Sequence, residues 1–345
     1  VENNMKKTNR VLITGGAGFI GSNFIPYFLQ SNPESQVINL DKLTYAGNLS
    51  YLEEVAMNPN YKFVKGDIVD SEGLEAIFME YEINQVIHFA AESHVDNSIS
   101  GPQEFINTNI VGTFLLLDTA RKFWMTKPGQ YKSDYEGSRF LHISTDEVFG
   151  SLSLADTELF KETTPYAPNS PYSASKASGD FLVRSYFHTF GMDVVTTNCS
   201  NNYGPKQHGE KLIPTIIRKA LNKEPIPIYG DGRNIRDWLY VLDHCRGIEL
   251  AFNNGRSGET YNIGGGNEQT NIEIANSLCE ILDRKRPLEK GSYKQFIEFV
   301  KDRPGHDRRY AIDASKITTE LNWLADEYLA SGLEKTVDWY LEYSL

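Results

Sequence analysis

Short apolar runs rich in β-branched residues alternate with longer amphipathic stretches over residues 10–198. Such runs predict strands, and the amphipathic stretches between most of them predict helices. Repeated strand–helix–strand units form a parallel sheet with right-handed connections and helices on both faces, which is the doubly wound α/β class. We place the strands at Val11–Thr14, Val37–Asp41, Tyr61–Lys65, Gln85–Phe89, Phe140–Ser144 and Val194–Asn198.

The pattern changes after residue 198. Residues 199–236 are rich in Pro, Gly and Asn and predict one clear amphipathic helix, at Ile213–Asn222. A helix at Asp243–Phe252 and a strand at Thr260–Ile263 are expected to rejoin the sheet, and residues 264–345 predict mixed helix and loop. We therefore expect two interleaved domains, one of residues 5–198 plus about 237–264 and a smaller one of residues 199–236 plus about 265–345.

Composition and charge narrow the functional classes. The chain has 345 residues, of which 40% are hydrophobic, so it can bury large cores. Its net charge of -12 disfavours electrostatic binding to nucleic acid or to an anionic membrane. Because no apolar run is long enough to span a bilayer and the N-terminal segment is polar, we expect a cytoplasmic protein.

The cysteines and histidines follow no ligand or disulfide spacing. Cys199, Cys245 and Cys279 lie far apart, so we expect buried, inert thiols. The seven histidines include no His-x-x-x-His pair, and we predict no metal site. Residues 1–4 precede Met5, and we expect them to be an addition to the native N-terminus.

A glycine-rich segment, Gly15-Gly16-Ala17-Gly18-Phe19-Ile20-Gly21, follows the first predicted strand directly. Such glycines let the backbone turn tightly and approach a pyrophosphate at the N-terminus of the next helix. A flexible turn would look similar. The preceding strand, the following apolar helix and Asp41, about 20 residues beyond the last glycine, favour a dinucleotide site in a Rossmann-type domain.

Asp41 also indicates which dinucleotide binds. It closes the second predicted strand, where a carboxylate accepts hydrogen bonds from ribose hydroxyls and would repel a 2′-phosphate. We therefore predict NAD rather than NADP, although neighbouring Lys42 weakens this preference. Two later strand ends agree, since Asp67-Ile68 could meet the adenine and the small residues of Ala90-Ala91 would allow close approach of the cofactor.

Tyr172 and Lys176 are spaced to share one face of a predicted helix. A tyrosine has an ordinary pKa of about 10, so it needs a nearby positive charge before it can act as a base. The Lys176 ammonium, assisted by a cationic nicotinamide, would lower the pKa of Tyr172. Tyr-x-x-x-Lys is common at protein surfaces, but after a dinucleotide-binding half it indicates catalysis.

Two adjacent carboxyl groups, Asp146 and Glu147, follow the fifth predicted strand in the run from Ser144 to Gly150. Carboxyl groups buried at the ligand end of a strand are costly unless they are solvated, paired or functional. Adjacent strand residues face opposite ways, so a turn is required to direct both at one ligand. The alternatives are an acid and base pair with separated pKa values, or one capping acid and one solvated acid.

Together these residues resemble the extended short-chain dehydrogenases/reductases, and most closely the dTDP-glucose 4,6-dehydratases. The resemblance runs from about Val11 to the C-terminus. The glycines and the Tyr-x-x-x-Lys pair mark only the superfamily, whereas the Asp146-Glu147 pair is lacking in the similar strand end of sugar-nucleotide epimerases. The segments that also match are 199–205, 229–236 and 302–310.

The resemblance implies a mechanism. Tyr172 would remove the proton from the hydroxyl at carbon 4 while hydride passes to NAD, with Thr145 supporting the same oxygen. Glu147 would remove the proton at carbon 5, and Asp146 would protonate the hydroxyl that leaves carbon 6. Hydride then returns to carbon 6, which makes the enzyme a lyase that gives dTDP-4-keto-6-deoxyglucose and regenerates NAD. The larger domain would bind NAD and the smaller one the nucleotide sugar.

We thus expect the catalytic group to be Thr145, Asp146, Glu147, Tyr172 and Lys176. The expected NAD-binding residues are Gly15, Gly18, Phe19, Ile20, Gly21, Asp41, Lys42, Thr44, Asp67, Ile68, Ala90, Ala91, Ser93, Thr108, Tyr172, Lys176 and Asn202. The expected substrate-binding residues are Ser93, Thr145, Asn201, Lys211, Leu212, Pro227, Tyr229, Arg236, Asn271, Arg303 and His306. Arginine suits this role because its planar fork binds phosphate bidentately.

The apolar character of residues 110–123 exceeds what one sheet face needs, and the helix of Tyr172 continues into Phe181, Leu182, Tyr186 and Phe190. A helix apolar on two sides needs a second partner, and the family commonly pairs such helices, so we expect a homodimer; thick packing against the second domain is the alternative.

Other readings of the function remain open: a dehydratase for another nucleotide, a 4-epimerase, or a non-catalytic NAD-binding sensor.

Overall fold

The computed structural model describes residues 9–155, 157–302 and 304–343 of the chain. The expectation about residues 1–4 and the assignment of Arg303 to the substrate site lie outside these ranges. In the described ranges, each helix is too short or too polar to cross a lipid bilayer.

A seven-stranded sheet forms the centre of the larger lobe, with the order β12-β8-β7-β4-β1-β2-β3 and with all neighbours parallel. The predicted doubly wound fold is therefore confirmed, and each predicted strand lies within one residue of the observed one at either end. The strands are β1 Arg10–Thr14, β2 Gln36–Asp41, β3 Tyr61–Lys65, β4 Gln85–His88, β7 Arg139–Thr145, β8 Val194–Cys199 and β12 Thr260–Ile263.

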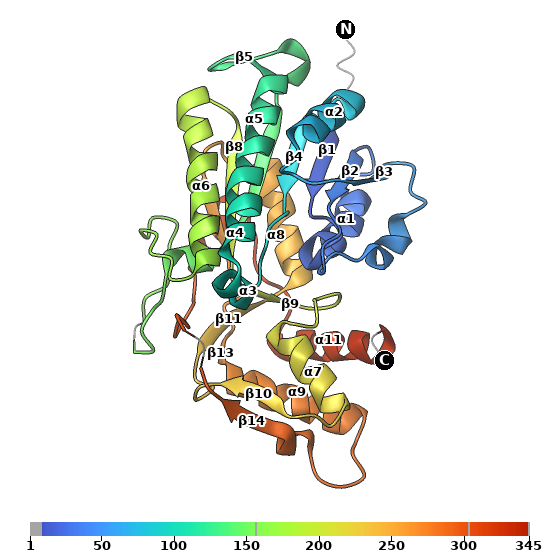
Figure 1. Cartoon of the computed structure of the whole chain (residues 1–345), viewed down its shortest axis with the longest axis vertical. Coiled ribbons are helices and arrows are strands. Elements are labelled where there is room, and N and C mark those ends of the chain that lie inside the picture. The colour runs from blue at the N-terminus through green and yellow to red at the C-terminus, as the bar shows by residue number, and fades with distance from the viewer. Residues whose placement is uncertain (1–8, 156, 303, 344–345) are drawn as a thin grey trace.

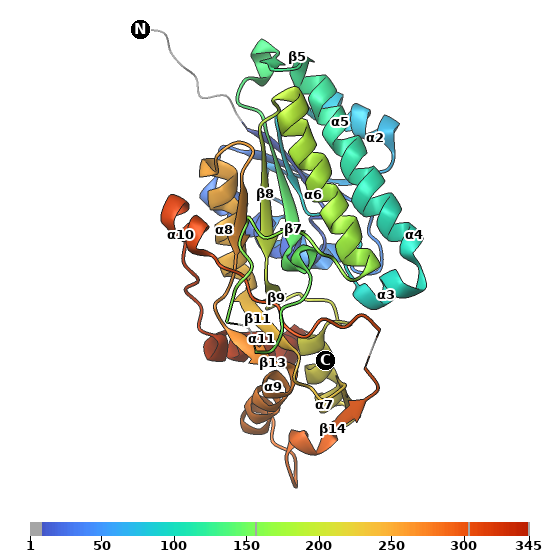
Figure 2. The ribbon, with the colours of Figure 1, turned by 90° about the vertical axis from the view of Figure 1, so that its left-hand side faces the viewer.

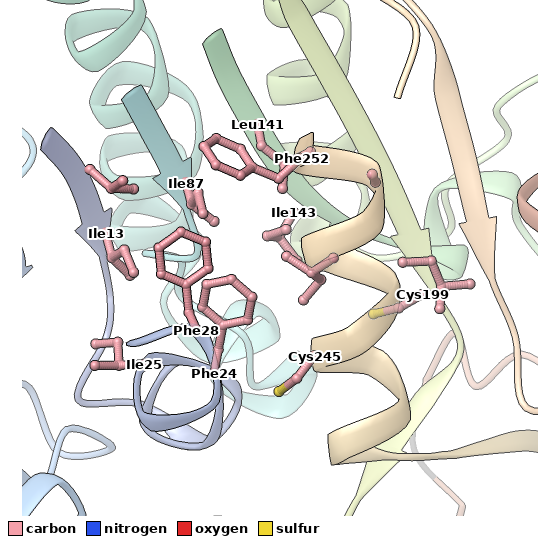
Figure 3. Packing of buried hydrophobic residues seen from close by; sticks show 14 of the residues in the cluster. Ile13, Phe24, Ile25, Phe28, Ile87, Leu141, Ile143, Cys199, Cys245 and Phe252 are labelled. Carbon is pink, nitrogen blue, oxygen red and sulfur yellow. The ribbon is translucent and has the colours of Figure 1, made fainter. Parts of the chain in front are cut away.

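Helices cover both faces of this sheet (Figures 1 and 2). Successive strand residues face opposite ways, so Ile13 of β1 packs into one core while its neighbour Leu12 packs into the other. The first core includes helix α1 (Phe19–Ser31) and helix α8 (Val241–Asn254), and Figure 3 shows Phe24 and Phe28 of α1 near Cys245 and Phe252 of α8. The second core is covered by α2 Ser71–Tyr81, α5 Thr113–Trp124 and α6 Pro171–Phe190.

The apolar stretch at residues 110–123 is not one regular helix. Helices α3 (Val95–Ser100) and α4 (Pro102–Phe105) lead into a π-helical turn at Ile106–Gly112, and α5 follows it directly. The π-turn buries Asn109, whose side-chain amide exchanges hydrogen bonds with the backbone of Glu92 at 2.9 and 3.0 Å. A short hairpin of β5 (Met125–Lys127) and β6 (Gln130–Tyr131) comes after α5.

A smaller lobe lies beyond the carboxyl ends of the parallel strands (Figures 1 and 2). The predicted helix at 213–222 is observed as α7, but the prediction of loop and helix elsewhere missed two small sheets, β13-β11-β9 and β10-β14. Their strands have three to six residues each, too short for a clear pattern. The domain boundaries stay a prediction. The elements are β9 Asn201–Tyr203, α7 Leu212–Leu221, β10 Ile226–Tyr229, β11 Ile235–Tyr240, β13 Glu268–Thr270, α9 Asn271–Lys285, β14 Ile297–Val300 and α11 Leu329–Tyr343. Helix α10 (Ser315–Leu321) instead packs against α8 and β12 of the larger lobe.

Candidate active site

A cavity of about 310 Å³ opens at the carboxyl ends of β1, β2, β4, β7 and β8. This is where the crevice rule for open parallel sheets places a ligand. The cavity brings together the glycine-rich loop, the Asp146-Glu147 pair and the Tyr172–Lys176 pair, which are far apart in the sequence.

The glycine-rich loop can be built only with glycine at two positions. Gly15 has a φ of 73°, and a Cβ there would lie 2.6 Å from the backbone nitrogen of Ala90. A Cβ on Gly21 would lie 2.6 Å from both Gly15 O and Gly16 Cα. Helix α1 begins immediately after Gly18, so its N-terminal amides face the cavity rim as a dinucleotide pyrophosphate requires.

Asp41 lines the cavity at the end of β2. Its Oδ2 accepts a hydrogen bond from Ala17 N at 2.9 Å and its Oδ1 accepts one from Leu43 N at 2.8 Å, which fixes the carboxylate beside the glycine loop. The Lys42 ammonium is 2.7 Å from Asp67 Oδ2, and this hydrogen bond raises the pKa of Lys42. Because Lys42 is paired with Asp67, it offsets the charge of Asp41 less than the sequence suggested.

Helix α6 presents Tyr172 and Lys176. Its start is fixed by a capping box: Ser170 Oγ accepts from Ser173 N at 3.0 Å and Ser173 Oγ accepts from Ser170 N at 3.0 Å, while Pro171 occupies the first turn. Both functional side chains are buried, and Lys176 Nζ donates to the backbone oxygen of Ile143 at 2.7 Å. The cap and the strand together hold this pair at the cavity wall.

The protein groups around Tyr172 together raise its pKa, and the lowering expected from Lys176 with a cationic nicotinamide stays a prediction. Burial, followed by the negative field of Glu147, raises the pKa of Tyr172 well above its ordinary value. Burial also lowers the pKa of Lys176, which opposes its ammonium form. The phenol therefore keeps its proton in the protein alone, and a bound cationic ring is the group that would favour its loss.

A 3-10 turn at Asp146–Phe149 directs both carboxyl groups into the same cavity, so the required turn after the strand is present. Thr145 ends β7 and its Oγ1 accepts from Glu147 N at 3.3 Å, which caps the turn. Gly150 closes it with a φ of 90°, where a Cβ would lie 2.5 Å from Ala167 O.

Asp146 is an unusual carboxyl group. It is 2% exposed, and its Oδ2 has no hydrogen-bond partner among the described residues. Burial, then the nearby carboxylates of Glu147 and Asp237, raise the pKa of Asp146 well above its ordinary value, against a smaller opposing effect of Arg236. These effects favour the protonated form of Asp146, which can donate a proton to a ligand.

Most of the expected site residues border this cavity. Those from the expected sets that line it are Gly15, Gly18, Phe19, Ile20, Gly21, Asp41, Lys42, Thr44, Asp67, Ile68, Ala90, Ala91, Ser93, Thr108, Thr145, Asp146, Glu147, Tyr172, Lys176, Asn201, Asn202 and Lys211. The sequence reasoning missed Cys199, Ser200, His208 and Glu210, which also line it. Cys199 is a buried thiol as expected, but it and Ser200 directly follow the strand predicted at 194–198, so the strand-end rule could have found both.

Six expected substrate residues lie outside the cavity lining, in or beside the smaller lobe: Leu212, Pro227, Tyr229, Arg236, Asn271 and His306. Arg236 is 5% exposed, donates to Asp307 O at 3.0 Å and stacks over the Tyr310 ring at 4.3 Å. The rings of Tyr229 and His306 are 6.2 Å apart. These six residues therefore do not form part of the cavity wall.

The fold and the Tyr172–Lys176 pair beside a glycine-loop cavity define an extended short-chain dehydrogenase/reductase. A family model described as GDP-mannose 4,6 dehydratase matches residues 12–336. The chain is 53% identical over 331 residues to the dTDP-glucose 4,6-dehydratase of Xanthomonas campestris. This match covers 96% of this chain and 92% of that one. The chain belongs to the nucleotide-sugar 4,6-dehydratase family.

Solved structures are similar over nearly the full length. A dTDP-glucose 4,6-dehydratase of Streptomyces venezuelae, solved with NAD and a second ligand, is 44% identical with a TM-score of 0.87 and covers 97% of each chain. A UDP-glucose 4-epimerase of Thermotoga maritima has a TM-score of 0.83 at 28% identity and covers 96% of this chain and 98% of that one. The fold is thus shared by both activities, and the identity is higher with the dehydratase.

Proposed function

We propose that this protein is an NAD-dependent lyase that converts dTDP-glucose to dTDP-4-keto-6-deoxyglucose. The observation that carries the proposal is the turn after β7, which brings the buried acid Asp146 and its neighbour Glu147 into one cavity with Tyr172 and Lys176. A 4-epimerase needs only the oxidation machinery, because epimerisation at carbon 4 eliminates nothing. A non-catalytic NAD sensor would need neither pair.

The residues present fit NAD. Gly15 and Gly21 let the glycine loop turn tightly against Ala90 and against itself, α1 directs its N-terminus at the rim, and Asp41 lines the cavity at the end of β2, where the adenosine ribose would bind. A bound NAD would supply the hydride acceptor for carbon 4 of the sugar and the hydride donor for carbon 6. Tyr172 takes the proton of the carbon 4 hydroxyl in the first step, and Lys176 and Thr145 hold the tyrosine and the sugar oxygen.

The second half uses the two carboxyl groups. Oxidation at carbon 4 acidifies the proton at carbon 5, and Glu147 removes it. Asp146 gives its proton to the carbon 6 hydroxyl, which leaves as water, so the C5–H and C6–O bonds break and a C5–C6 double bond forms. Hydride addition at carbon 6 and return of a proton to carbon 5 complete the product. Unequal environments suit the two acids to these unequal roles.

We assign the nucleotide to the smaller lobe. Arg236 and the Tyr229–His306 pair supply a cation and ring faces in this part of the chain, and Lys211 Nζ donates to Ser93 O at 2.9 Å, which links the two lobes at the cavity mouth. Cationic side chains here suit a diphosphate.

We further propose a homodimer formed through α5, α6 and the preceding π-turn. Apolar side chains exposed on these elements are Ile106, Val111, Phe114 and Phe181, at 50%, 41%, 41% and 57%. A second copy would cover them. Phe181→Glu should shift the protein toward monomer in sedimentation analysis, and an unchanged species would exclude this face.

Three unpaired buried thiols support a cytoplasmic location.

The decisive experiment incubates the purified protein with dTDP-glucose, and with UDP- and GDP-sugars in parallel, and follows the keto sugar by mass spectrometry and NMR. We expect the 4-keto-6-deoxy product from dTDP-glucose. The UDP- and GDP-sugars should react more slowly or not at all. An epimerised hexose without loss of water would contradict the dehydratase, and faster turnover of another nucleotide sugar would contradict the assigned base.

A further inference from the structure

A second buried carboxyl group lies one helical turn beyond Lys176. Asp180 is 5% exposed, and its Oδ2 accepts hydrogen bonds from Ser144 Oγ and from Tyr166 OH, both at 2.9 Å. His142 Nε2 lies 3.2 Å from its Oδ1. The donors come from β7 and from the segment before α6, so several elements hold this carboxyl group in place. None of the steps proposed above uses it.

The cation that balances Asp180 is Lys176 rather than His142. Burial, followed by the positive field of Lys176, lowers the pKa of His142 well below its ordinary value, so the imidazole is neutral. The ring of His88 is 5.3 Å from that of His142. Burial also lowers the pKa of His88 well below its ordinary value, so this imidazole is neutral too. Lys176 and Asp180 are four residues apart on α6 and therefore share a helical face.

Adjacent residues of β7 fix the two side chains. Lys176 Nζ donates to the backbone oxygen of Ile143, and the next residue, Ser144, donates to Asp180. Burial lowers the pKa of Lys176, and the negative field of Asp180 opposes this most strongly. Burial raises the pKa of Asp180 to about 6, even though Lys176, Ser144 and Tyr166 each favour its ionised form. Each group thus favours the ionised form of the other against the effect of burial.

Two arrangements of one proton compete at the Tyr172–Lys176 pair. With the proton on Lys176, the Tyr172 phenolate can accept the proton of the sugar hydroxyl; with the proton on Tyr172, a neutral lysine leaves no base. A negative charge close to residue 176 favours the first arrangement. The carboxylate that acts most strongly on Tyr172 is instead that of Glu147, which favours the neutral phenol.

We propose that Asp180 is a positioning residue for the oxidation step, whose charge keeps the proton on Lys176 so that Tyr172 can act as the base. This rests on the roles proposed above for Tyr172 and Lys176. The titratable groups around the ammonium are Tyr172 and Asp180 on α6, His142 on β7, His88 on β4 and Cys199 on β8. Of these, Asp180 is the group that carries a negative charge at neutral pH, because burial raises the pKa of the Cys199 thiol to about 12.

The test is Asp180→Asn, which keeps the size and an oxygen acceptor for Ser144 and Tyr166 but removes the charge. The alkaline limb of the kcat–pH profile reports loss of the proton from Lys176. Removing a nearby negative charge makes that loss easier, so the limb should move to lower pH. On its alkaline side kcat should fall about tenfold, within the range for coupled neighbours. The KM for dTDP-glucose should change little, because Asp180 does not line the cavity.

Matched variants separate charge from structure. Tyr166→Phe and Ser144→Ala each remove one donor to Asp180 but leave its charge at alkaline pH, so neither should move the limb. Asp180→Glu restores the charge and should return the limb toward its native position. If the asparagine variant does not fold, Asp180→Ser is a smaller neutral replacement with the same expected shift.

A uniform loss of kcat in Asp180→Asn, with the alkaline limb in its native position, would overturn the proposal, because that is the result of a merely structural role. Native kcat with a native limb would overturn it too. Tyr172→Phe serves as the reference for the underlying assignment. If Tyr172→Phe turns over normally, the proposed function of Tyr172 fails; if it is inactive and the Asp180→Asn limb is unmoved, only the role of Asp180 fails.

Discussion

Replacing Asp146 by asparagine tests the second half of the reaction. The side chain is 2% exposed, and burial and two carboxylates raise its pKa well above the ordinary value, which favours the protonated acid in the native protein. Asparagine has the same shape but no acidic proton. General acids typically contribute about 10²- to 10⁴-fold, or about 3–5 kcal/mol of barrier at about 1.4 kcal/mol per tenfold. We expect the upper half of that range, since little water can reach the site in place of Asp146.

The oxidation step should survive in Asp146→Asn, because Tyr172 and Lys176 are unchanged. In a single turnover, reduced NAD should therefore build up and persist, as measured by its absorbance, while the keto sugar forms slowly. Near-native turnover, or loss of the NAD reduction itself, would refute the assignment of Asp146 as the acid.

The same variant has a stability signature. The pKa of Asp146 is raised on folding, so the stability it contributes is full below the unfolded pKa and is lost as pH rises through the folded pKa. At pH 7 the native acid therefore costs stability, and Asp146→Asn should have a Tm equal to or above that of the native protein. A clearly lower Tm at pH 7 that recovers in acid would show that the sign is wrong.

Three further changes test the rest of the structure. Asp41→Ala should reduce the preference for NAD over NADP without unfolding the protein, as measured by cofactor titration; native protein that binds NADP equally well would contradict the role of Asp41. Gly21→Ala places a Cβ 2.6 Å from the backbone of the glycine loop and should weaken NAD binding by about 1–3 kcal/mol; native affinity in calorimetry would show that the loop can adjust. Ser170→Ala removes the cap of α6 and should cost about 1 kcal/mol of unfolding free energy in denaturant titration, and an unchanged midpoint would exclude this contribution.

The sequence predicted the parallel sheet well because β-branched runs bounded by turns give a strong local signal. The end of each strand then located most of the cavity, since carboxyl ends of parallel strands share one edge. Asp146 and Glu147 could be named, but the 3-10 turn that aims both at one cavity depends on Gly150 and its contact with Ala167, which is a tertiary feature.

The parts that could not be predicted depend on distant contacts. Strand β10 pairs with β14, about 70 residues later, so neither shows a local hairpin signal. The π-turn that buries Asn109 adds a residue to a helix whose apolar pattern looked continuous. The burial that raises the pKa of Tyr172 could not be predicted either, because helical spacing shows the neighbouring Lys176 but does not show the depth of burial.

The most direct test of the proposed reaction follows a deuterium label from carbon 4 of dTDP-glucose in the native protein. If hydride is passed to NAD and returned within one closed cavity, the label must reappear at carbon 6 of the 4-keto-6-deoxy product. In Glu147→Gln the transfer should stop after NAD reduction, and solvent exchange at carbon 5 should fall by orders of magnitude. Label at carbon 6 is the predicted result. Label returned to carbon 4 in a hexose that keeps its carbon 6 hydroxyl would contradict the dehydratase function.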